Sequence, residues 1–371
     1  MIPVNDLLLD ETDLANLISA FRSGWISSAG EFLERFETAW AGYCGVAHGI
    51  AVTNGTTALD IAVQSLSLAP GDEVILPTFT IISCAGAIVR AGAVPVLVDS
   101  EPRTWCMDVS RIESLITPRT RAIMAVHTYG HPVDMQPLLA LAGKHRLTVI
   151  EDAAEAHGAE VLLADGWRRC GAVGHIATFS FYANKLVTTG EGGMIVTDDA
   201  RLAARCRELR NLCFQPKRRF FHEELGTNAR MTNLQAAIGV SQVERMPRIL
   251  ERKRWMGRAY EERLRDLAAI ELQVQEDWAR GVYWVFGMVL ADDVPFDATE
   301  FAARLRERSV ETRPFFIGMH EQPVFDELFR EQHHPIAERI ARRGLYVPSG
   351  LAITESQIDQ VCEAVRGALA P

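Results

Sequence analysis

The chain has no Cys-x-x-Cys pair, although seven cysteines occur in its 371 residues. The cysteines are scattered and odd in number. They therefore fit neither the even framework of a small disulfide-rich domain nor the spacing of zinc ligands. We expect a reduced, cytoplasmic protein that holds no metal.

Long apolar runs, basic clusters and one glycine motif are also missing. No stretch of about 18 apolar residues occurs, and the first residues, MIPVNDLLLDETDL, lack the basic and apolar segments of a secretion signal. The formal net charge is −10, and no basic run could follow a phosphate backbone. No G-x-G-x-x-G follows the first expected strand, which argues against a nicotinamide enzyme. We expect neither a membrane span nor a nucleic acid partner.

Short apolar runs alternate with helical patterns through the first two thirds of the chain. Residues 48–66 give a strand, a turn and a helix with apolar residues near the 3.6 period. The runs GDEVILP, AVPVLVDS and LTVIEDA are rich in Val, Ile and Leu, as strands covered on both faces are. We expect an α/β large domain with an N-terminal arm and a mostly parallel sheet over residues 1–245. A smaller α+β domain should follow over residues 246–371.

Polar residues end two of the expected strands, at the sheet edge where α/β proteins bind ligands. Gly55 and Thr56 in TNGTTAL begin a helix whose N–H groups and dipole favour a phosphate, although an ordinary N-cap explains the same pattern. Asp152 ends the strand of VIEDAAEAHGA, where a buried carboxylate needs a cation or several donors. A helix cap or a salt bridge to an arginine is the alternative. Glu151 should point to the other face, since side chains alternate along a strand.

Lys185 lies in TFSFYANKLVTTGEGGMIV, between an apolar strand and a glycine-rich turn, with Ser180 five residues earlier. A lysine is ordinarily a surface residue, but few charges surround this one in the sequence. A buried lysine can be neutral enough to form a Schiff base with an aldehyde. Pyridoxal 5'-phosphate combines an aldehyde, a ring nitrogen that an acid keeps protonated, and a phosphate. The lysine, the acid and the phosphate site together predict this cofactor.

Seven stretches, spread over nearly the whole chain, resemble the nucleotide-sugar aminotransferases. These are fold-type I transferases that depend on pyridoxal phosphate and are similar to aspartate aminotransferase, and the resemblance is closest to their GDP-perosamine synthase branch. It implies a homodimer with shared active sites. L-glutamate would donate an amino group to a nucleotide-linked 4-keto-6-deoxy sugar by a ping-pong mechanism. The stretches are GWISSAGEFLERFE, NGTTALDIA, GDEVILPTFT, VIEDAAEAHGA, TFSFYANKLVTTGEGGMIVT, NARMTNLQAAIG and ETRPFF.

The resemblance also implies roles for single residues. Lys185 would carry the Schiff base and shuttle the proton, and Asp152 would pair with the ring nitrogen. The other expected cofactor-binding residues are Gly55, Thr56, Glu155 near the ring oxygen, Ser180, and Asn228, which would reach the cofactor phosphate of the partner subunit. Candidates for substrate binding are Trp25, Ser27, Ser28, Arg230, Arg313 and His320. For these last candidates a core tryptophan, solvated arginines and a packing histidine are the alternatives.

Three positions depart from the pattern of this family. Ile81 stands where relatives often carry an aromatic residue over the cofactor ring, and Ala229 and Gly318 are smaller than their counterparts. These departures leave the identity of the molecule that accepts the amino group open. A UDP- or TDP-linked ketosugar and a ketocyclitol are alternatives, and a non-catalytic regulatory protein that binds pyridoxal phosphate is another. Lys185 argues against the relatives that carry histidine there and remove a hydroxyl.

Overall fold

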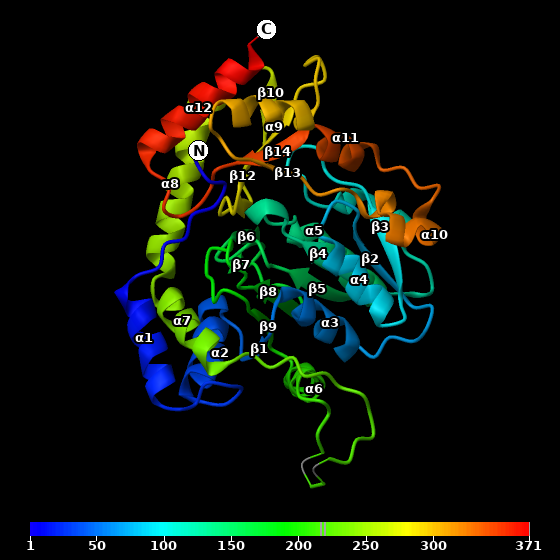
Figure 1. Cartoon of the computed structure of the whole chain (residues 1–371). Helices are drawn as coiled ribbons and strands as arrows, with labels where there is room; N and C mark the ends of the chain where they lie inside the picture. Colours follow the sequence, from blue (N-terminus) through cyan, green and yellow to red (C-terminus); the bar gives the residue numbers. More distant parts are fainter. Residues whose placement is uncertain (216, 219, 371) are drawn as a thin grey trace.

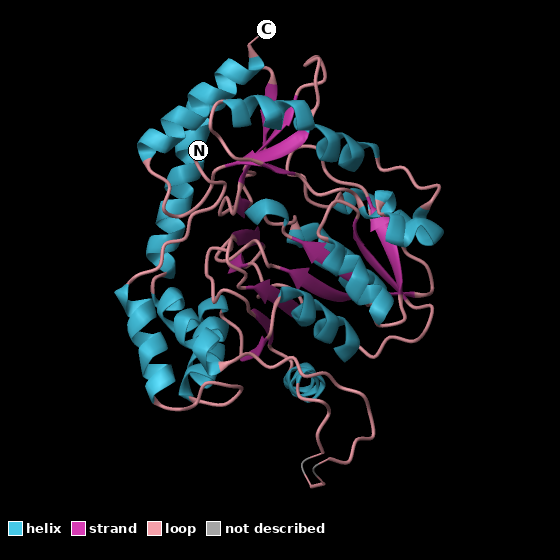
Figure 2. Cartoon of the chain, viewed as in Figure 1, coloured by secondary structure: helices cyan, strands magenta, loops and turns pink. Residues whose placement is uncertain are grey.

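The computed structural model describes residues 1–215, 217–218 and 220–370. A seven-stranded sheet, ordered β1-β9-β8-β5-β4-β2-β3, forms its centre (Figures 1 and 2). Strand β9 pairs antiparallel with both neighbours, and every other pairing is parallel. The expected α/β fold with a mostly parallel sheet is confirmed. The strands are β1 (His48–Val52), β2 (Glu73–Pro77), β3 (Val94–Val98), β4 (Thr120–Val126), β5 (Thr148–Asp152), β8 (Ile176–Ser180) and β9 (Gly193–Thr197).

Helices cover both faces of this sheet. Helices α3, α4 and α6 share one core with the side chains of one sheet face. Helices α2, α5 and α7 pack on the opposite face, and α1 packs against α7. Burial on both faces explains why the strand sequences read as continuous apolar runs. The helices are α1 (Glu11–Arg22), α2 (Glu31–Cys44), α3 (Gly55–Ser65), α4 (Ile82–Arg90), α5 (Met135–His145), α6 (Ala200–Arg210) and α7 (Asn233–Glu244).

The C-terminal part of the chain forms a second, antiparallel sheet ordered β10-β12-β14-β13, with its own apolar core. The long helix α8 runs along the side of the molecule from α7 toward α12 (Figure 1). The division near residue 245 stays a prediction, although α7 ends and α8 begins there. The elements are α8 (Met246–Leu264), β10 (Ile270–Leu272), β12 (Phe286–Leu290), α9 (Ala298–Glu307), β13 (Arg313–Pro314), α10 (Asp326–Phe329), α11 (Pro335–Arg343), β14 (Gly344–Val347) and α12 (Glu355–Leu369).

Two pairings join the C-terminal part to the rest of the chain. Strand β11 (Ala279–Arg280) pairs with β6 (Glu160–Leu163), which also pairs with β7 (Gly166–Arg169). At the other end of the chain, Ile2 forms a bridge with Val310. The N-terminal segment therefore contacts the C-terminal part, whereas the sequence prediction assigned it to the large domain.

Within the described residues, no helix is long and apolar enough to cross a membrane. The same residues include no cluster of three or more His, Cys, Asp or Glu side chains suited to a metal ion. All seven cysteines are free and buried.

Candidate active site

A cavity of about 500 Å³ opens where five strands of the central sheet end. The segments that follow β1, β2, β4, β5 and β8 supply most of its walls. Six of the seven cofactor-binding residues expected from the sequence line it, and the seventh, Asn228, does not. The six are Gly55, Thr56, Asp152, Glu155, Ser180 and Lys185.

Lys185 lies in the turn after β8 and is buried, with 10% of its side chain exposed. Its Nζ is 3.5 Å from Oε1 of Glu155 and 3.5 Å from the centre of the indole ring of Trp284. Burial lowers the pKa of Lys185, and the charges of Glu155 and Asp152 oppose this shift. An amine with a lowered pKa is more often neutral, and only the neutral amine is a nucleophile.

Glu155 is fixed by the backbone N–H of Tyr129, which donates to its Oε2 at 2.8 Å. Burial raises the pKa of Glu155 to about 7, against the lowering effect of Lys185. Glu155 can therefore exchange a proton near neutral pH.

The substitution Glu155→Gln should change how stability depends on pH in the protein freed of any cofactor. Because the pKa is raised on folding, the carboxyl stabilises the fold fully below its ordinary value of 4.5 and loses this effect as the pH rises through about 7. The stability of the variant relative to the original should therefore rise between these pH values, by roughly 1–3 kcal/mol. Thermal unfolding across this range measures it.

A matched control for this experiment is Glu113→Gln at the surface. The pKa of Glu113 is lowered, chiefly by its hydrogen bond with Lys144, so this variant should show no such rise between pH 4.5 and 7. A flat difference for Glu155→Gln over the same range would contradict the raised pKa.

Asp152 ends β5 and is buried, with only 3% of its surface exposed. Its Oδ1 accepts the N–H of Ala154 at 3.0 Å, and its Oδ2 accepts the thiol of Cys84 at 3.1 Å. In the part of the chain that the structure describes, no arginine, lysine or histidine forms an ion pair with Asp152 within 4.0 Å. No helix begins between β5 and β6 in the described chain, so neither the alternative of a helix cap nor that of a salt bridge to an arginine accounts for this carboxylate.

Glu151 points to the opposite side of the sheet, as the alternation of side chains predicted. Its carboxylate accepts the N–H groups of Gly171, Val173 and Gly174 at 2.6–2.9 Å and lies 3.0 Å from the ring of His127. It therefore fixes a loop and takes no part in the cavity.

The start of α3 forms the other end of the cavity. Asn54, not Gly55 or Thr56, caps the helix, because its side chain accepts the N–H of Thr57 at 2.9 Å. The earlier N–H groups of the first turn have no intrahelical acceptor, as at any helix start. A Cβ on Gly55 would lie 2.7 Å from the Cβ of Ser180, so glycine is needed for this close approach of α3 to the end of β8.

Several residues of the cavity were missed by the sequence prediction. Trp284, Phe316 and Tyr346 come from the C-terminal part of the chain. The strand-like runs YWVFGMVL and VETRPFF contain Trp284 and Phe316, but a run does not tell which of its side chains meets a distant cavity. Ile81, the expected aliphatic cover, does line the cavity and is 41% exposed.

The other candidates lie outside this cavity. Trp25 is 62% exposed, and Ser27 and Asn228 are also at the surface. Ser28 and Arg230 line a separate cavity of about 960 Å³. There the guanidinium of Arg230 donates to Oδ1 of Asn211 at 2.6 Å.

Arg313 and His320 have partners within the chain. Arg313 is exposed and pairs with Glu311 at 2.7 Å. The buried ring of His320 lies 2.7 Å from Oγ1 of Thr78 and 3.2 Å from Oε1 of Glu338. These contacts fit the alternatives of a solvated arginine and a packing histidine.

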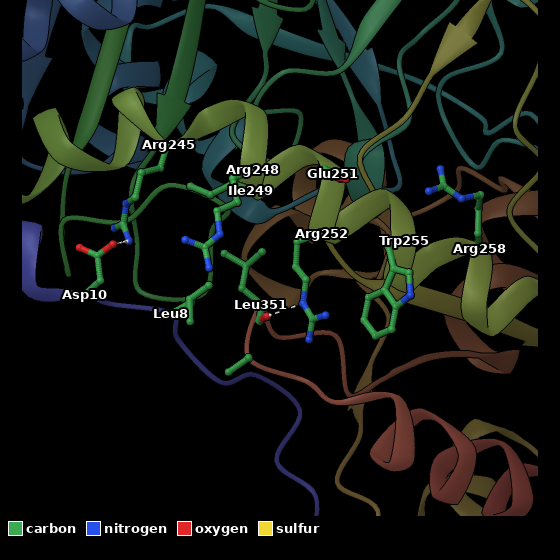
Figure 3. Close-up of a pocket in the computed structure, with 11 residues that line it drawn as sticks. Leu8, Asp10, Arg245, Arg248, Ile249, Glu251, Arg252, Trp255, Arg258 and Leu351 are labelled. Carbon is green, nitrogen blue, oxygen red and sulfur yellow. Dashed lines mark hydrogen bonds and ion pairs between the residues drawn. The ribbon is translucent and has the colours of Figure 1, made fainter.

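A further cavity, of about 630 Å³, follows α8 and carries arginines but no lysine (Figure 3). Arg245 binds Asp10 of the N-terminal segment, and Arg252 donates to the carbonyl of Leu351 at 3.2 Å. These contacts tie the N-terminal segment and the loop after β14 to α8. The cavity offers no nucleophile or proton-transfer group like those beside Lys185.

A lysine amine beside two buried carboxylates, at the strand ends of an α/β sheet, defines an enzyme site for covalent chemistry through lysine. Residues 8–366 match the family model described as the DegT/DnrJ/EryC1/StrS aminotransferase family. The chain belongs to this family and is an aminotransferase.

Relatives of known name agree with this assignment. The chain is similar to the GDP-perosamine synthase of Caulobacter vibrioides, with 42% identity over 358 residues that cover 96% of this chain and 95% of the relative. The GDP-perosamine synthase of Escherichia coli O157:H7 is 38% identical over 364 residues, or 98% and 97% of the two chains. The fold is similar to that of S. venezuelae DesV in complex with a ketimine intermediate. That comparison gives a TM-score of 0.89 and 35% identity, and covers 97% of this chain and 94% of the other. The family resemblance read from the sequence is confirmed.

Proposed function

We propose that the protein depends on pyridoxal phosphate and moves the amino group of L-glutamate to a GDP-linked 4-keto-6-deoxy sugar. The observation that carries the proposal is the buried amine of Lys185, held beside Glu155 in a cavity that also contains Asp152. The similarity of the protein to two GDP-perosamine synthases, over nearly the full chain, supports this choice of sugar and nucleotide.

The residues of the cavity fit the cofactor. Asp152 is a buried carboxylate that receives one backbone N–H and one thiol, and among the described residues no arginine, lysine or histidine lies within 4.0 Å of it. A buried carboxylate with so few donors is costly unless a cation meets it, and a protonated ring nitrogen is such a cation. The start of α3 and the hydroxyls of Thr56 and Ser180 offer donors for a phosphate.

The bound cofactor would supply an electron-withdrawing ring joined to the nitrogen that is transferred. Lys185 would take up and release the proton at its Nζ and so act as general base and general acid. Asp152 would keep the ring nitrogen protonated through its carboxylate. Glu155, with a pKa raised to about 7, would exchange a proton beside Lys185. Trp284, buried over the amine, would exclude water from it.

We propose a homodimer in which each subunit completes the other's site. The segment of Trp25 and Ser27 is tied to Asn233, whose side chain donates to the carbonyl of Trp25 at 2.7 Å and whose N–H donates to that of Ser27 at 2.6 Å. An unusual number of apolar side chains is exposed nearby, which is typical of an interface. Asn228 would reach the cofactor phosphate of the partner subunit from this surface. The exposed apolar residues are Leu14, Ile18, Phe21, Trp25 and Ile26.

The visible absorption spectrum of the purified protein tests the proposal. We expect a visible band that L-glutamate bleaches and that returns when GDP-4-keto-6-deoxymannose is added, because the two half-reactions are separate. Return only with a UDP- or TDP-linked ketosugar, or with a ketocyclitol, would keep the enzyme class and correct the acceptor. A band that does not change with glutamate would favour a regulatory protein, and the lack of any band would contradict the assignment of the cofactor.

Seven free cysteines support a cytoplasmic location for this reaction.

A further inference from the structure

The chain contains only four lysines among its 38 basic residues, and two of the four are buried. One is Lys185 in the cavity. The other is Lys253 on α8, which is 2% exposed. Lysine is seldom fully buried, because its amine loses water that only well-placed partners replace. The partners of Lys253 therefore need an explanation.

The amine of Lys253 binds two main-chain carbonyls. Its Nζ donates to the oxygen of Trp284 at 2.9 Å and to that of Ser349 at 2.5 Å. No carboxylate lies within 4.0 Å of it among the residues described. Burial lowers the pKa of Lys253 to about 7, and in either charge state the amine keeps two N–H groups for these carbonyls.

The two carbonyls belong to segments that close the cavity. Trp284 precedes β12 and Ser349 follows β14, the strand that carries Tyr346 into the cavity wall. The hydroxyl of Ser349 accepts the N–H of Phe286 at 2.8 Å, so both segments are joined at this point. Lys253 thus links α8 to both.

Trp284 continues the connection to the reacting amine. Its indole N–H donates to the carbonyl of Asn184 at 2.8 Å, and its ring face lies 3.5 Å from Nζ of Lys185. A cation over an indole face is attracted by the ring, most strongly where water is excluded. The ring position therefore affects both where the Lys185 nitrogen lies and how readily it carries a proton.

We propose that Lys253 is a positioning residue for amino transfer, which holds the main chain at Trp284 and Ser349 and thereby keeps the indole ring against the nitrogen of Lys185. The inference rests on the proposed function, since it assigns Lys185 the proton transfer. Lys253 does not itself line the cavity, and it contacts the wall only through the main-chain carbonyl of Trp284.

The test compares Lys253→Met, Trp284→Leu and the double variant, all as the loaded enzyme. Methionine keeps the length of the side chain and removes its donors. We expect kcat to fall roughly 10- to 100-fold, as for a small misplacement of a catalytic group, with KM for the sugar little changed. The pH midpoint of the visible band should also fall by about 0.5 unit or more, because the ring no longer stabilises the protonated nitrogen.

The double variant separates positioning from packing. If Lys253 acts through Trp284, adding Lys253→Met to Trp284→Leu should move the midpoint no further. None of the other titratable groups described around Lys185 is changed. They are Glu155, Asp152 and His157, together with Tyr182, Glu191 and Tyr346 in the cavity wall. The inference would be overturned if Lys253→Met did not change the pH midpoint of the visible band. It would also be overturned if Lys253→Met shifted this midpoint by the same amount in the original protein and in the Trp284→Leu variant.

Two further comparisons keep the outcome clear. If Lys253→Met does not fold, Lys253→Gln retains N–H donors on a shorter side chain and should give a smaller fall of the midpoint. No fall would refute the role. Lys144→Met, at an exposed lysine paired with Glu113, should leave the midpoint unchanged. Failure of the original protein to show a band that glutamate bleaches would refute the proposed function itself, which is a different result.

Discussion

Replacement of Lys185 by alanine should abolish amino transfer and leave the fold intact. Among the described residues that line the cavity, Lys185 alone carries an amine, and this amine lies 3.5 Å from Oε1 of Glu155, so no other amine there can take its place. Loss of a proton-transfer group alone costs roughly 10²- to 10⁴-fold, and loss of the covalent attachment adds to this. Turnover with glutamate and a ketosugar measures the effect, and circular dichroism measures the fold.

A surface lysine provides the control for this substitution. Lys144→Ala removes an exposed amine that is paired with Glu113 and should retain full turnover. If Lys185→Ala kept turnover within tenfold of the original, Lys185 would not be the reacting amine and the proposed function would fail with it.

Asp152→Asn should leave the protein folded and slow the reaction by about 10²- to 10³-fold, the usual cost of removing one electrostatic stabiliser in an active site. The amide has the shape of the carboxylate but carries no charge, so it cannot hold a proton on a ring nitrogen. Asp152 is the acceptor in both of its hydrogen bonds, one at each carboxylate oxygen. Asparagine has one acceptor oxygen in the same place, so it can keep only one of these bonds. The rate at which glutamate bleaches the visible band measures the change directly.

The substitution Cys84→Ala separates the charge of Asp152 from its hydrogen bonds. It removes the thiol that donates to Oδ2 at 3.1 Å and keeps the carboxylate. We expect less than about a tenfold loss, because a thiol is a weak hydrogen-bond donor and the carboxylate keeps its charge. A rate for Asp152→Asn close to that of the original would show that the charge is not used.

The residues at the ends of the central strands could be predicted because local patterns determine them. The run LTVIED reads as a buried strand that stops at a carboxylate, and alternation alone placed Glu151 on the opposite face from Asp152. The glycine after Asn54 signalled the start of α3. In each of these cases the signal lay in a few consecutive residues, although partners such as Cys84 of Asp152 and Ser180 of Gly55 lie far along the chain.

The wall formed by Trp284, Phe316 and Tyr346 could not be predicted in this way. These side chains line one cavity with Lys185 although they lie far from it in the sequence, and no local pattern encodes that approach. The direction of β9 is a similar case. GMIVT is equally apolar in either direction, and its pairing with both β1 and β8 depends on contacts distant in the sequence. The roles of Trp25 and Asn228, both at the surface, stay predictions.

The two pairings that join the parts of the chain limit how the enzyme can move. Strand β11 pairs with β6 only four residues before Trp284, and Ile2 forms a second bridge with the C-terminal part at Val310. A hinge that swung this part outward would have to break backbone hydrogen bonds at both places. We therefore expect the cavity around Lys185 to keep one shape while the proposed amino donor and sugar bind in turn. Both substrates would then enter the cavity by the same route.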